Sequence, residues 1–291
     1  MISSGAVSGL QSAPVNDSPS ASIRLVAIDL DGTLLNDARQ VSEQTARALS
    51  CLPERDVKVV IASARPPRSV REIYRRLRLD TWQINYNGAM IWDEPAGRVV
   101  FHQPMPSEVV RRIVDTARSH CASVLVSCEI LDKWYTDRVD ENLVRRFATE
   151  TAKLFAPDVI APVDEFCTQP ITKLLLLGEP ATLAEVAEVV LRKHGQGISL
   201  IHSEPQLLQI MDSRAGKAPA LRLVAEHYGV AMEQVMAIGD AVNDIEMLRA
   251  SGVAVAMDNA DPRVKEAARW VAPSNNDHGV HAALRRFGLC D

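Results

Sequence analysis

Residues 23–33 read Ile-Arg-Leu-Val-Ala-Ile-Asp-Leu-Asp-Gly-Thr, an apolar run that ends in two carboxylates and a glycine. Such a short apolar run predicts a buried strand, and Asp29 and Asp31 follow at its carboxyl end. Side chains alternate along a strand, so both acids share one side, and Gly32 allows a sharp turn after them. One carboxylate can act as a nucleophile while its neighbour handles protons. Two acids beside a core are unfavourable without a compensating cation, although Asp-Gly is also a common turn pair.

The composition is that of a globular protein and narrows the classes of partner. The chain has 291 residues, of which 47% are hydrophobic and 24% charged, enough for one large domain or two smaller ones. Its formal net charge of -5 argues against a nucleic-acid partner, because binding phosphate backbones usually needs a basic face. Small anionic substrates remain compatible with this charge, since only the local field acts on them.

Cysteine usage and the amino-terminal stretch indicate a cytoplasmic protein. The five cysteines are odd in number, dispersed and without CxxC spacing, which is typical of reduced thiols rather than disulfides or a zinc site. Residues 1–22 are rich in Ser, Ala, Gly and Pro and contain no Lys or Arg, which predicts a disordered tail without a targeting signal. No apolar run approaches transmembrane length, so no membrane partner is expected.

Short apolar runs alternate with amphipathic helices along the chain, which predicts an α/β fold with parallel strands. Ser42 is a candidate N-cap for the first helix. A predicted strand over residues 57–62 leads to Ser63 and Arg65, and another over residues 82–86 ends at Asn87 and Gly88. Further along, a predicted strand over residues 234–238 leads to Gly239 and Asp240.

A change in the sequence pattern near residue 91 predicts a domain boundary. Several Pro and Gly residues over residues 95–106 indicate a connection, and an α/β insertion follows with predicted helices over residues 107–120, 141–152 and 183–194. The last of these starts with Thr182-Leu183-Ala184-Glu185, a capping-box pattern. We therefore expect four segments: a disordered tail (1–22), the first part of the core (23–90), the insertion (91–211) and the second part of the core (212–291).

Polar residues collect at the carboxyl ends of the predicted strands, where ligands bind in open parallel sheets. Asp29, Asp31, Ser63 and Asp240 all lie at such ends. Asn243 and Asp244 follow Asp240 at a strand-to-helix turn. Carboxylate oxygens in this number suit Mg²⁺, which prefers octahedral oxygen coordination.

These motifs resemble the haloacid dehalogenase (HAD) superfamily, and within it the Cof-type phosphatases (subclass IIB). The resemblance covers residues 23–284. Motif one matches Asp29 to Thr33, motif two Ser63, motif three Lys217, and motif four Gly239-Asp240 with Asn243-Asp244. The chain departs from the common pattern at motif two, where it has Ser63-Ala64-Arg65 in place of Thr-Gly-Arg, and after Lys217, where Ala218 replaces a frequent glycine.

The resemblance implies roles for the matching residues. Asp29 would attack phosphorus and become an aspartyl phosphate, while Asp31 would protonate the leaving oxygen and then activate water. Mg²⁺ would be held by the Asp29 carboxylate, the Asp31 carbonyl and Asp240, with Asp244 bound directly or through a water. Phosphate binding falls to three residues, Ser63, Lys217 and Asn243. Substrate contacts are expected from Asn87, Gly88 and Arg65.

The resemblance also implies an overall organisation and an activity. The expected fold is a Rossmann-like core with parallel strands, interrupted by the smaller α/β insertion, which acts as a cap over the crevice. The expected function is Mg²⁺-dependent hydrolysis of a small phosphomonoester, either a sugar phosphate or a phosphorylated cofactor. Two alternatives remain open at this point: a sugar phosphomutase of the same superfamily, and a non-catalytic regulator that binds sugar phosphates. The oligomeric state is not predicted.

Overall fold

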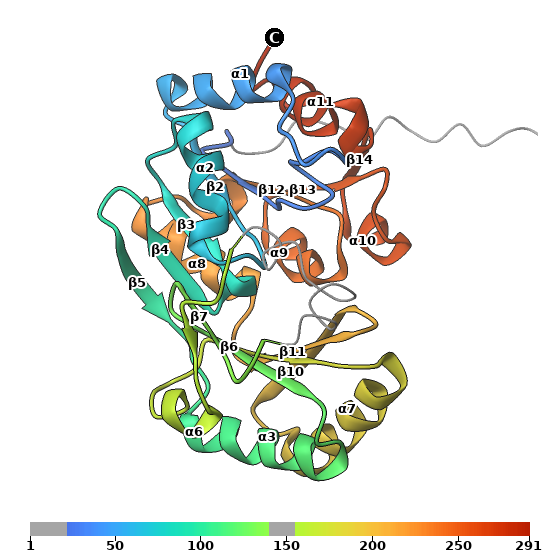
Figure 1. The fold of residues 1–291 in the computed structure, drawn as a ribbon. Coiled ribbons are helices and arrows are strands. Elements are labelled where there is room, and N and C mark those ends of the chain that lie inside the picture. The colour runs from blue at the N-terminus through green and yellow to red at the C-terminus, as the bar shows by residue number, and fades with distance from the viewer. Residues whose placement is uncertain (1–21, 140–154) are drawn as a thin grey trace, which may run out of the picture.

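The computed structural model describes residues 22–139 and 155–291, which form three β-sheets and their covering helices (Figure 1). Residues 1–21 of the predicted tail and the predicted helix over residues 141–152 lie outside the described residues. Among the residues that are described, no helix is both long enough and apolar enough to cross a membrane.

The core is a five-stranded parallel sheet with the strand order β14-β13-β12-β1-β2. Its central strand β1 has parallel neighbours on both sides, with Ile28 opposite Ile238 on one side and Ile61 on the other. The carboxyl ends of these strands therefore meet at one edge. The strands are β1 (Leu25–Ile28), β2 (Lys58–Ile61), β12 (Val235–Gly239), β13 (Val253–Met257) and β14 (Trp270–Ala272).

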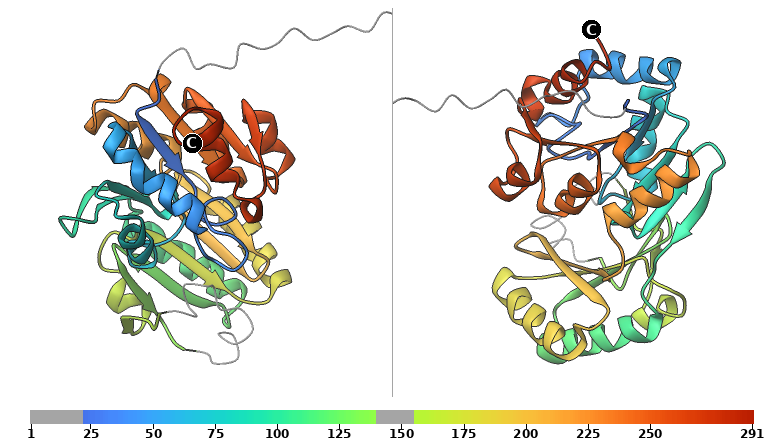
Figure 2. Two further views of the ribbon diagram at one scale, coloured as in Figure 1. Left: turned by 90° about the horizontal axis from the view of Figure 1, so that it is seen from above. Right: turned by 180° about the vertical axis from the view of Figure 1, so that it is seen from behind.

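Helices cover both faces of the parallel sheet, as the two further views show (Figure 2). Val26 and Ile28 of β1 pack in one cluster with α1 (Glu43–Cys51), α2 (Pro67–Leu77) and α11 (Gly279–Arg286). Leu25 and Ala27 face the opposite cluster, which contains α8 (Lys217–His227), α9 (Ile245–Ala250) and α10 (Pro262–Ala267). The alternation of β1 thus builds a three-layer core, and the α/β fold with parallel strands predicted from the sequence is confirmed.

The insertion contains a six-stranded sheet with the order β10-β11-β9-β6-β7-β8, in which only the β7·β8 pair is parallel. Its strands are β6 (Leu125–Ile130), β7 (Lys133–Thr136), β8 (Val159–Ile160), β9 (Lys173–Leu177), β10 (Ile198–Glu204) and β11 (Leu207–Asp212). Helices α3 (Ser107–His120), α6 (Val163–Phe166) and α7 (Pro180–His194) cover the face away from the core (Figures 1 and 2). The other face carries Glu129, Lys173 and Gln209.

A third sheet replaces the connection that the sequence predicts after residue 91. Strands β3 (Trp82–Asn85), β4 (Met90–Asp93) and β5 (Arg98–His102) pair in antiparallel fashion. The sequence did not indicate the β4–β5 hairpin, and Pro95 and Gly97, which predicted a connection, lie in its turn. β3 meets the parallel sheet through a single bridge between Ala62 and Ile84. The division into segments at residues 91 and 211 stays a prediction.

Two helix starts test the capping predictions. Ser42 caps α1 as expected, since its side chain accepts a hydrogen bond from the Thr45 backbone N–H at 3.2 Å. The capping box predicted from Thr182 was wrong, because α7 already begins at Pro180. Proline suits the first helical position, because an N–H at that position has no acceptor within the helix.

Five short 3₁₀ turns complete the described secondary structure. They are η1 (Leu52–Arg55), η2 (Tyr86–Gly88), η3 (Met232–Gln234), η4 (Val242–Asp244) and η5 (Asn275–Asp277).

Gly88 is the point where the turn after β3 touches the start of α8. Its φ is +92°, and a Cβ there would lie 2.0 Å from the carbonyl oxygen of Gly216, directly before α8. We expect Gly88→Ala to lower the free energy of unfolding by about 3 kcal/mol or more, because it adds a backbone collision to an unfavourable φ. Denaturant titration followed by circular dichroism measures this loss.

Gly97→Ala is the matched control. Gly97 has φ +62°, and nothing lies within 4 Å of the position that a Cβ would take there, so its replacement carries only the cost of the backbone conformation, about 1 kcal/mol. Equal losses for the two variants would contradict the close approach of Gly88 to Gly216.

Candidate active site

The parallel register brings three predicted residues to one edge of the core sheet. The Asp29 N–H donates to the Ile238 carbonyl at 2.9 Å, and the Ala62 N–H donates to the Ile28 carbonyl at 2.9 Å. Asp29, Ser63 and Asp240 therefore follow the ends of three adjacent strands, β1, β2 and β12. This placement is a consequence of strand order, which puts β1 between the other two.

Lys217 connects this edge to the returning part of the chain. It is the first residue of α8, and its side chain is completely buried. Its Nζ donates to Asp29 Oδ1 and, at 2.7 Å, to Asp244 Oδ1. The second oxygen of Asp244 accepts from the backbone N–H groups of Asp240, at 3.1 Å, and Ala241, at 3.0 Å. One ammonium thus joins two carboxylates from distant segments.

Asp29, Asp240 and Asp244 form an acidic cluster, with one oxygen of each lying within 4.8 Å of the others. Burial and the charge of Asp244 raise the pKa of Asp29 well above its ordinary value, against the opposing effect of Lys217. Burial is also the main reason that the pKa of Asp240 is raised to about 6. Although burial opposes its charge, Asp244 and Asp29 hold the pKa of Lys217 above its ordinary value.

The donor set of this cluster fits Mg²⁺. Three carboxylates face a single ammonium, so a further cation would relieve their repulsion, and all the available ligand atoms are hard oxygens. Gly32 belongs to the same arrangement, because a Cβ at this position, where φ is +81°, would lie 2.4 Å from Asp240 Oδ2. The turn after Asp31 can therefore approach Asp240 only with glycine there.

Asp31 points towards Arg65 rather than into the acidic cluster. Arg65 Nε donates to Asp31 Oδ2 at 2.8 Å, and Arg65 Nη2 makes a second contact with Oδ1. The Asp31 side chain is 55% exposed. Ser63 lies close by, buried, and its hydroxyl oxygen accepts the Arg65 backbone N–H at 3.1 Å. Arg65 thus connects motif two to Asp31 of motif one.

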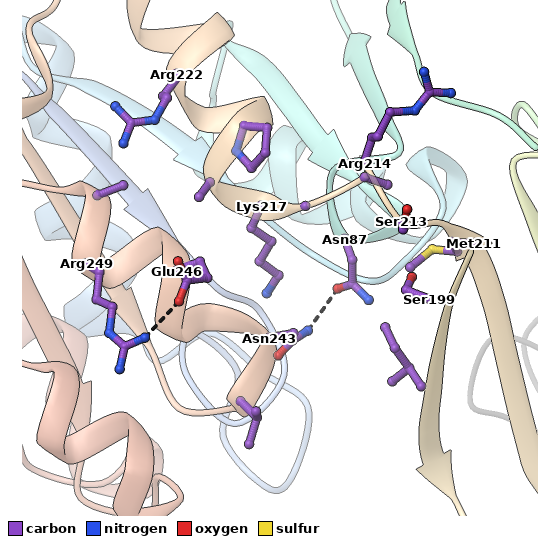
Figure 3. A pocket seen from close by; sticks show the side chains of 17 residues that line it. Asn87, Ser199, Met211, Ser213, Arg214, Lys217, Arg222, Asn243, Glu246 and Arg249 are labelled. Atoms are coloured by element: carbon purple, nitrogen blue, oxygen red, sulfur yellow. Dashed lines mark hydrogen bonds and ion pairs between the residues drawn. The ribbon is translucent and has the colours of Figure 1, made fainter. Parts of the chain in front are cut away.

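Asn87 and Asn243 lie on the side of Lys217 that faces a pocket of about 660 Å³ (Figure 3). Asn243 Nδ2 donates to Asn87 Oδ1 at 2.9 Å, and the Asn87 N–H donates to the Ser63 carbonyl at 3.0 Å. Asn87 has φ 53°, a left-handed conformation that asparagine tolerates. Gly88 supports this arrangement through the start of α8 rather than by lining the pocket.

Several contacts at this site have partners that the sequence did not indicate. The Thr33 hydroxyl donates to Asp240 Oδ1 at 2.5 Å, and Asn259 Nδ2 donates to the Gly32 carbonyl at 2.8 Å. From the insertion, Lys173 Nζ donates to the Ala64 carbonyl at 3.3 Å. Thr33 belongs to motif one, which was the available signal for it. A buried lysine such as Lys173 carries no comparable sequence signal.

Arg68 closes a second contact between the insertion and the core. It pairs with Glu129 at 2.8 Å, and Glu129 also accepts the Tyr86 hydroxyl at 3.1 Å. Burial raises the pKa of Glu129 above its ordinary value, against the effect of Arg68. The Arg68 guanidinium lies largely out of solvent.

Comparisons with known proteins agree on one family. Residues 26–284 match the family model described as haloacid dehalogenase-like hydrolase. The chain is 32% identical over 270 residues to the 5-amino-6-(5-phospho-D-ribitylamino)uracil phosphatase YitU of Bacillus subtilis, covering 90% of this chain and 97% of that protein. It is 28% identical to the HMP-PP phosphatase of Cronobacter sakazakii, covering 83% of this chain and 86% of that protein.

Solved structures give the same result for the fold. A haloacid dehalogenase-like hydrolase from Bacteroides thetaiotaomicron superposes with a TM-score of 0.81 at 28% identity, covering 91% of this chain and 99% of that one. A protein from Thermotoga maritima also reaches a TM-score of 0.81, at 30% identity, covering 91% and 97% of the two chains. These matches confirm the resemblance and the α/β fold inferred from the sequence. The chain belongs to the haloacid dehalogenase-like hydrolase family.

Proposed function

We propose that this protein is a Mg²⁺-dependent phosphatase that hydrolyses a small phosphomonoester through an aspartyl phosphate on Asp29. The observation that carries this proposal is the buried contact of Lys217 with Asp29 and Asp244, beside Asp240. A carboxylate held by an ammonium at the open edge of a parallel sheet is oriented for attack, and the ammonium is placed to neutralise phosphate charge.

In the first step, a carboxylate oxygen of Asp29 attacks phosphorus as the bond from phosphorus to the ester oxygen breaks. The departing alkoxide takes a proton from Asp31 and leaves as an alcohol. Lys217 and the Ser63 hydroxyl stabilise the charge that develops on the phosphoryl oxygens, and Asn243 helps to orient the phosphate. The product of this step is an acyl phosphate on Asp29.

In the second step, water attacks the phosphorus of the acyl phosphate, and Asp31 takes its proton. The bond from phosphorus to the Asp29 oxygen breaks, so that phosphate is released and the carboxylate is restored. The ion pair with Arg65 places the Asp31 carboxylate as an acceptor. Arg65 therefore positions Asp31 for the base half of the cycle, and Asp31 must leave Arg65 to act as an acid.

The metal would be held by the Asp29 and Asp240 carboxylates and the Asp31 backbone carbonyl, with Asp244 in support. When bound, Mg²⁺ supplies positive charge that stabilises the phosphoryl oxygens. Asp244 already accepts three hydrogen bonds, from Lys217 and two backbone N–H groups, which favours a supporting position for this residue.

A small substrate suits the position of the insertion and the names of the relatives. Lys173 and Glu129 of the six-stranded sheet contact core residues next to motif two, at 3.3 Å from the Ala64 carbonyl and 2.8 Å from Arg68. This arrangement supports residues 91–211 as a cap that limits access. The YitU and HMP-PP phosphatase relatives are named for small phosphorylated compounds, which supports a substrate of similar size here.

Replacing Asp29 tests the nucleophile. We expect Asp29→Asn to lower phosphate release by at least about a thousandfold, because an amide oxygen is a far weaker nucleophile than a carboxylate. The free energy of unfolding without metal should not fall, since the raised pKa of Asp29 means that its charge is unfavourable in the folded protein. Phosphate release from 4-nitrophenyl phosphate and thermal unfolding measure the two quantities.

Asp56→Asn is the matched control, because Asp56 is 77% exposed and lies outside the site, where it pairs with Arg24. It should keep the wild-type rate. An Asp29→Asn protein that is folded and hydrolyses at a normal rate would remove Asp29 as the nucleophile.

Replacing Asp240 tests the metal site without relying on activity. Mg²⁺ should raise the Tm of the wild type by binding the folded state, and Asp240→Asn should reduce this increase. The metal-free variant should also be more stable than the wild type at pH 8. An acid whose folded pKa is about 6, above its ordinary 3.8, loses its stabilising contribution as pH rises through this interval, and asparagine avoids that loss.

Differential scanning fluorimetry with and without Mg²⁺ measures both effects. Asp258→Asn is the control, since Asp258 is 69% exposed and paired with Lys265. An equal Mg²⁺ shift in wild type and Asp240→Asn would exclude Asp240 as a ligand.

A further inference from the structure

The pocket beside Lys217 has room for more than a phosphoryl group. Its volume is about 660 Å³, within the range of small-molecule sites. Lys217, Asn87 and Asn243 belong both to its lining and to the candidate active site, so the two are continuous (Figure 3). Its remaining walls come from α8, η4 and α9 of the core, from β10 and β11 of the insertion, and from residues 213–216 between β11 and α8.

The charge of this lining is opposite to that of the whole chain. Four cations and one acid line the pocket, whereas the chain carries a formal net charge of -5. The lining charges are Arg214, Lys217, Arg222, Arg249 and Glu246. A cavity with mostly one sign of charge concentrates ligands of the other sign.

Arg222 differs from the other cations of the pocket. Lys217 is held by Asp29 and Asp244, Arg214 pairs with Asp212 at 2.9 Å, and Arg249 pairs with Glu246 at 2.8 Å. Arg222 forms no ion pair and no side-chain hydrogen bond with any residue in the described part of the chain. Its planar guanidinium therefore keeps its full set of donors for a carboxylate or a phosphate.

The wall contributed by the insertion has a different character. Ile201 and Met211 of β10 and β11 present apolar surface, while Ser199 offers a hydroxyl. Figure 3 shows Met211 and Ser199 on one side of Lys217 and Arg222 on the other. A ligand that fits this distribution has a phosphate near Lys217, an uncharged part against the wall of the insertion and an anionic group that reaches Arg222.

We infer that the substrate is a phosphomonoester with a second anionic group, either a carboxylate or another phosphate, which Arg222 binds in this pocket. This inference rests on the proposed phosphatase activity and adds the class of leaving group to it. Arg222 is a specificity residue in this account: it contacts the far end of the substrate and takes no part in bond breaking.

Two pairs of substrates test the inference. In the first pair, 6-phosphogluconate has a carboxylate where glucitol 6-phosphate has a hydroxymethyl group. In the second pair, fructose 1,6-bisphosphate has one phosphate more than fructose 6-phosphate. We expect kcat/KM to be at least about tenfold higher for the doubly anionic member of at least one pair, mainly through a lower KM, because an ion pair binds one end of the ligand. The pair that shows the difference identifies the anionic group.

Arg222→Gln should reduce this preference to within about twofold and leave kcat/KM for glucitol 6-phosphate and fructose 6-phosphate unchanged. Arg75→Gln is the matched control, since Arg75 is an exposed helical arginine of α2, 68% exposed and outside the pocket. It removes the same charge and should retain the preference. Wild-type and variant rates are all measured as free phosphate in Mg²⁺.

Three results would overturn the inference. Equal kcat/KM within both pairs would show that a second anionic group does not improve the substrate, although the phosphatase activity itself would still stand. Retention of the preference in Arg222→Gln, or an equal loss in Arg75→Gln, would remove Arg222 as its cause. No phosphate release from these four compounds or from 4-nitrophenyl phosphate would overturn the proposed function, and the inference with it.

Discussion

The buried ammonium of Lys217 is the interaction on which the arrangement of this site depends. It joins Asp29 at the end of β1 to Asp244 in η4, and it enters from the start of α8. The first of these segments is separated in sequence from the other two by the whole insertion. Removing this ammonium would leave the two buried carboxylates without their cation, and an uncompensated buried charge typically costs about 3–5 kcal/mol. The packing of the core and the geometry of the candidate site are therefore coupled through one side chain.

The two parts of the core and the insertion meet in the same region. Gly88 meets the Gly216 carbonyl where the chain returns to the core, directly before Lys217. Lys173 reaches the carbonyl beside Ser63, and burial lowers its pKa to about 8. A shift of the six-stranded sheet would therefore move or break the contact between Lys173 and motif two. A cap that closes over a reaction centre requires such a connection.

The sequence predicted the main features of the fold because they follow from local patterns. Short apolar runs ending in Asp29, Ser63 and Asp240 become adjacent strand ends as soon as the sheet is parallel. The β4–β5 hairpin was missed because its Pro95 and Gly97 look the same in a turn as in a long connection. The partners of Asp31 and Thr33 depend on side chains brought close only by tertiary packing, so no periodicity indicates that one binds Arg65 and the other Asp240.

The central claim, that Asp29 carries the phosphoryl group, can be tested on the protein itself. Turnover of 4-nitrophenyl phosphate in Mg²⁺ is stopped by a rapid quench, and borohydride then reduces any acyl phosphate to the corresponding alcohol. Mass spectrometry of the digested protein locates the reduced residue. Our account predicts reduction at Asp29 during turnover and none without substrate. Normal turnover with no reduction at Asp29 at any quench time, or with reduction at another carboxylate, would contradict it.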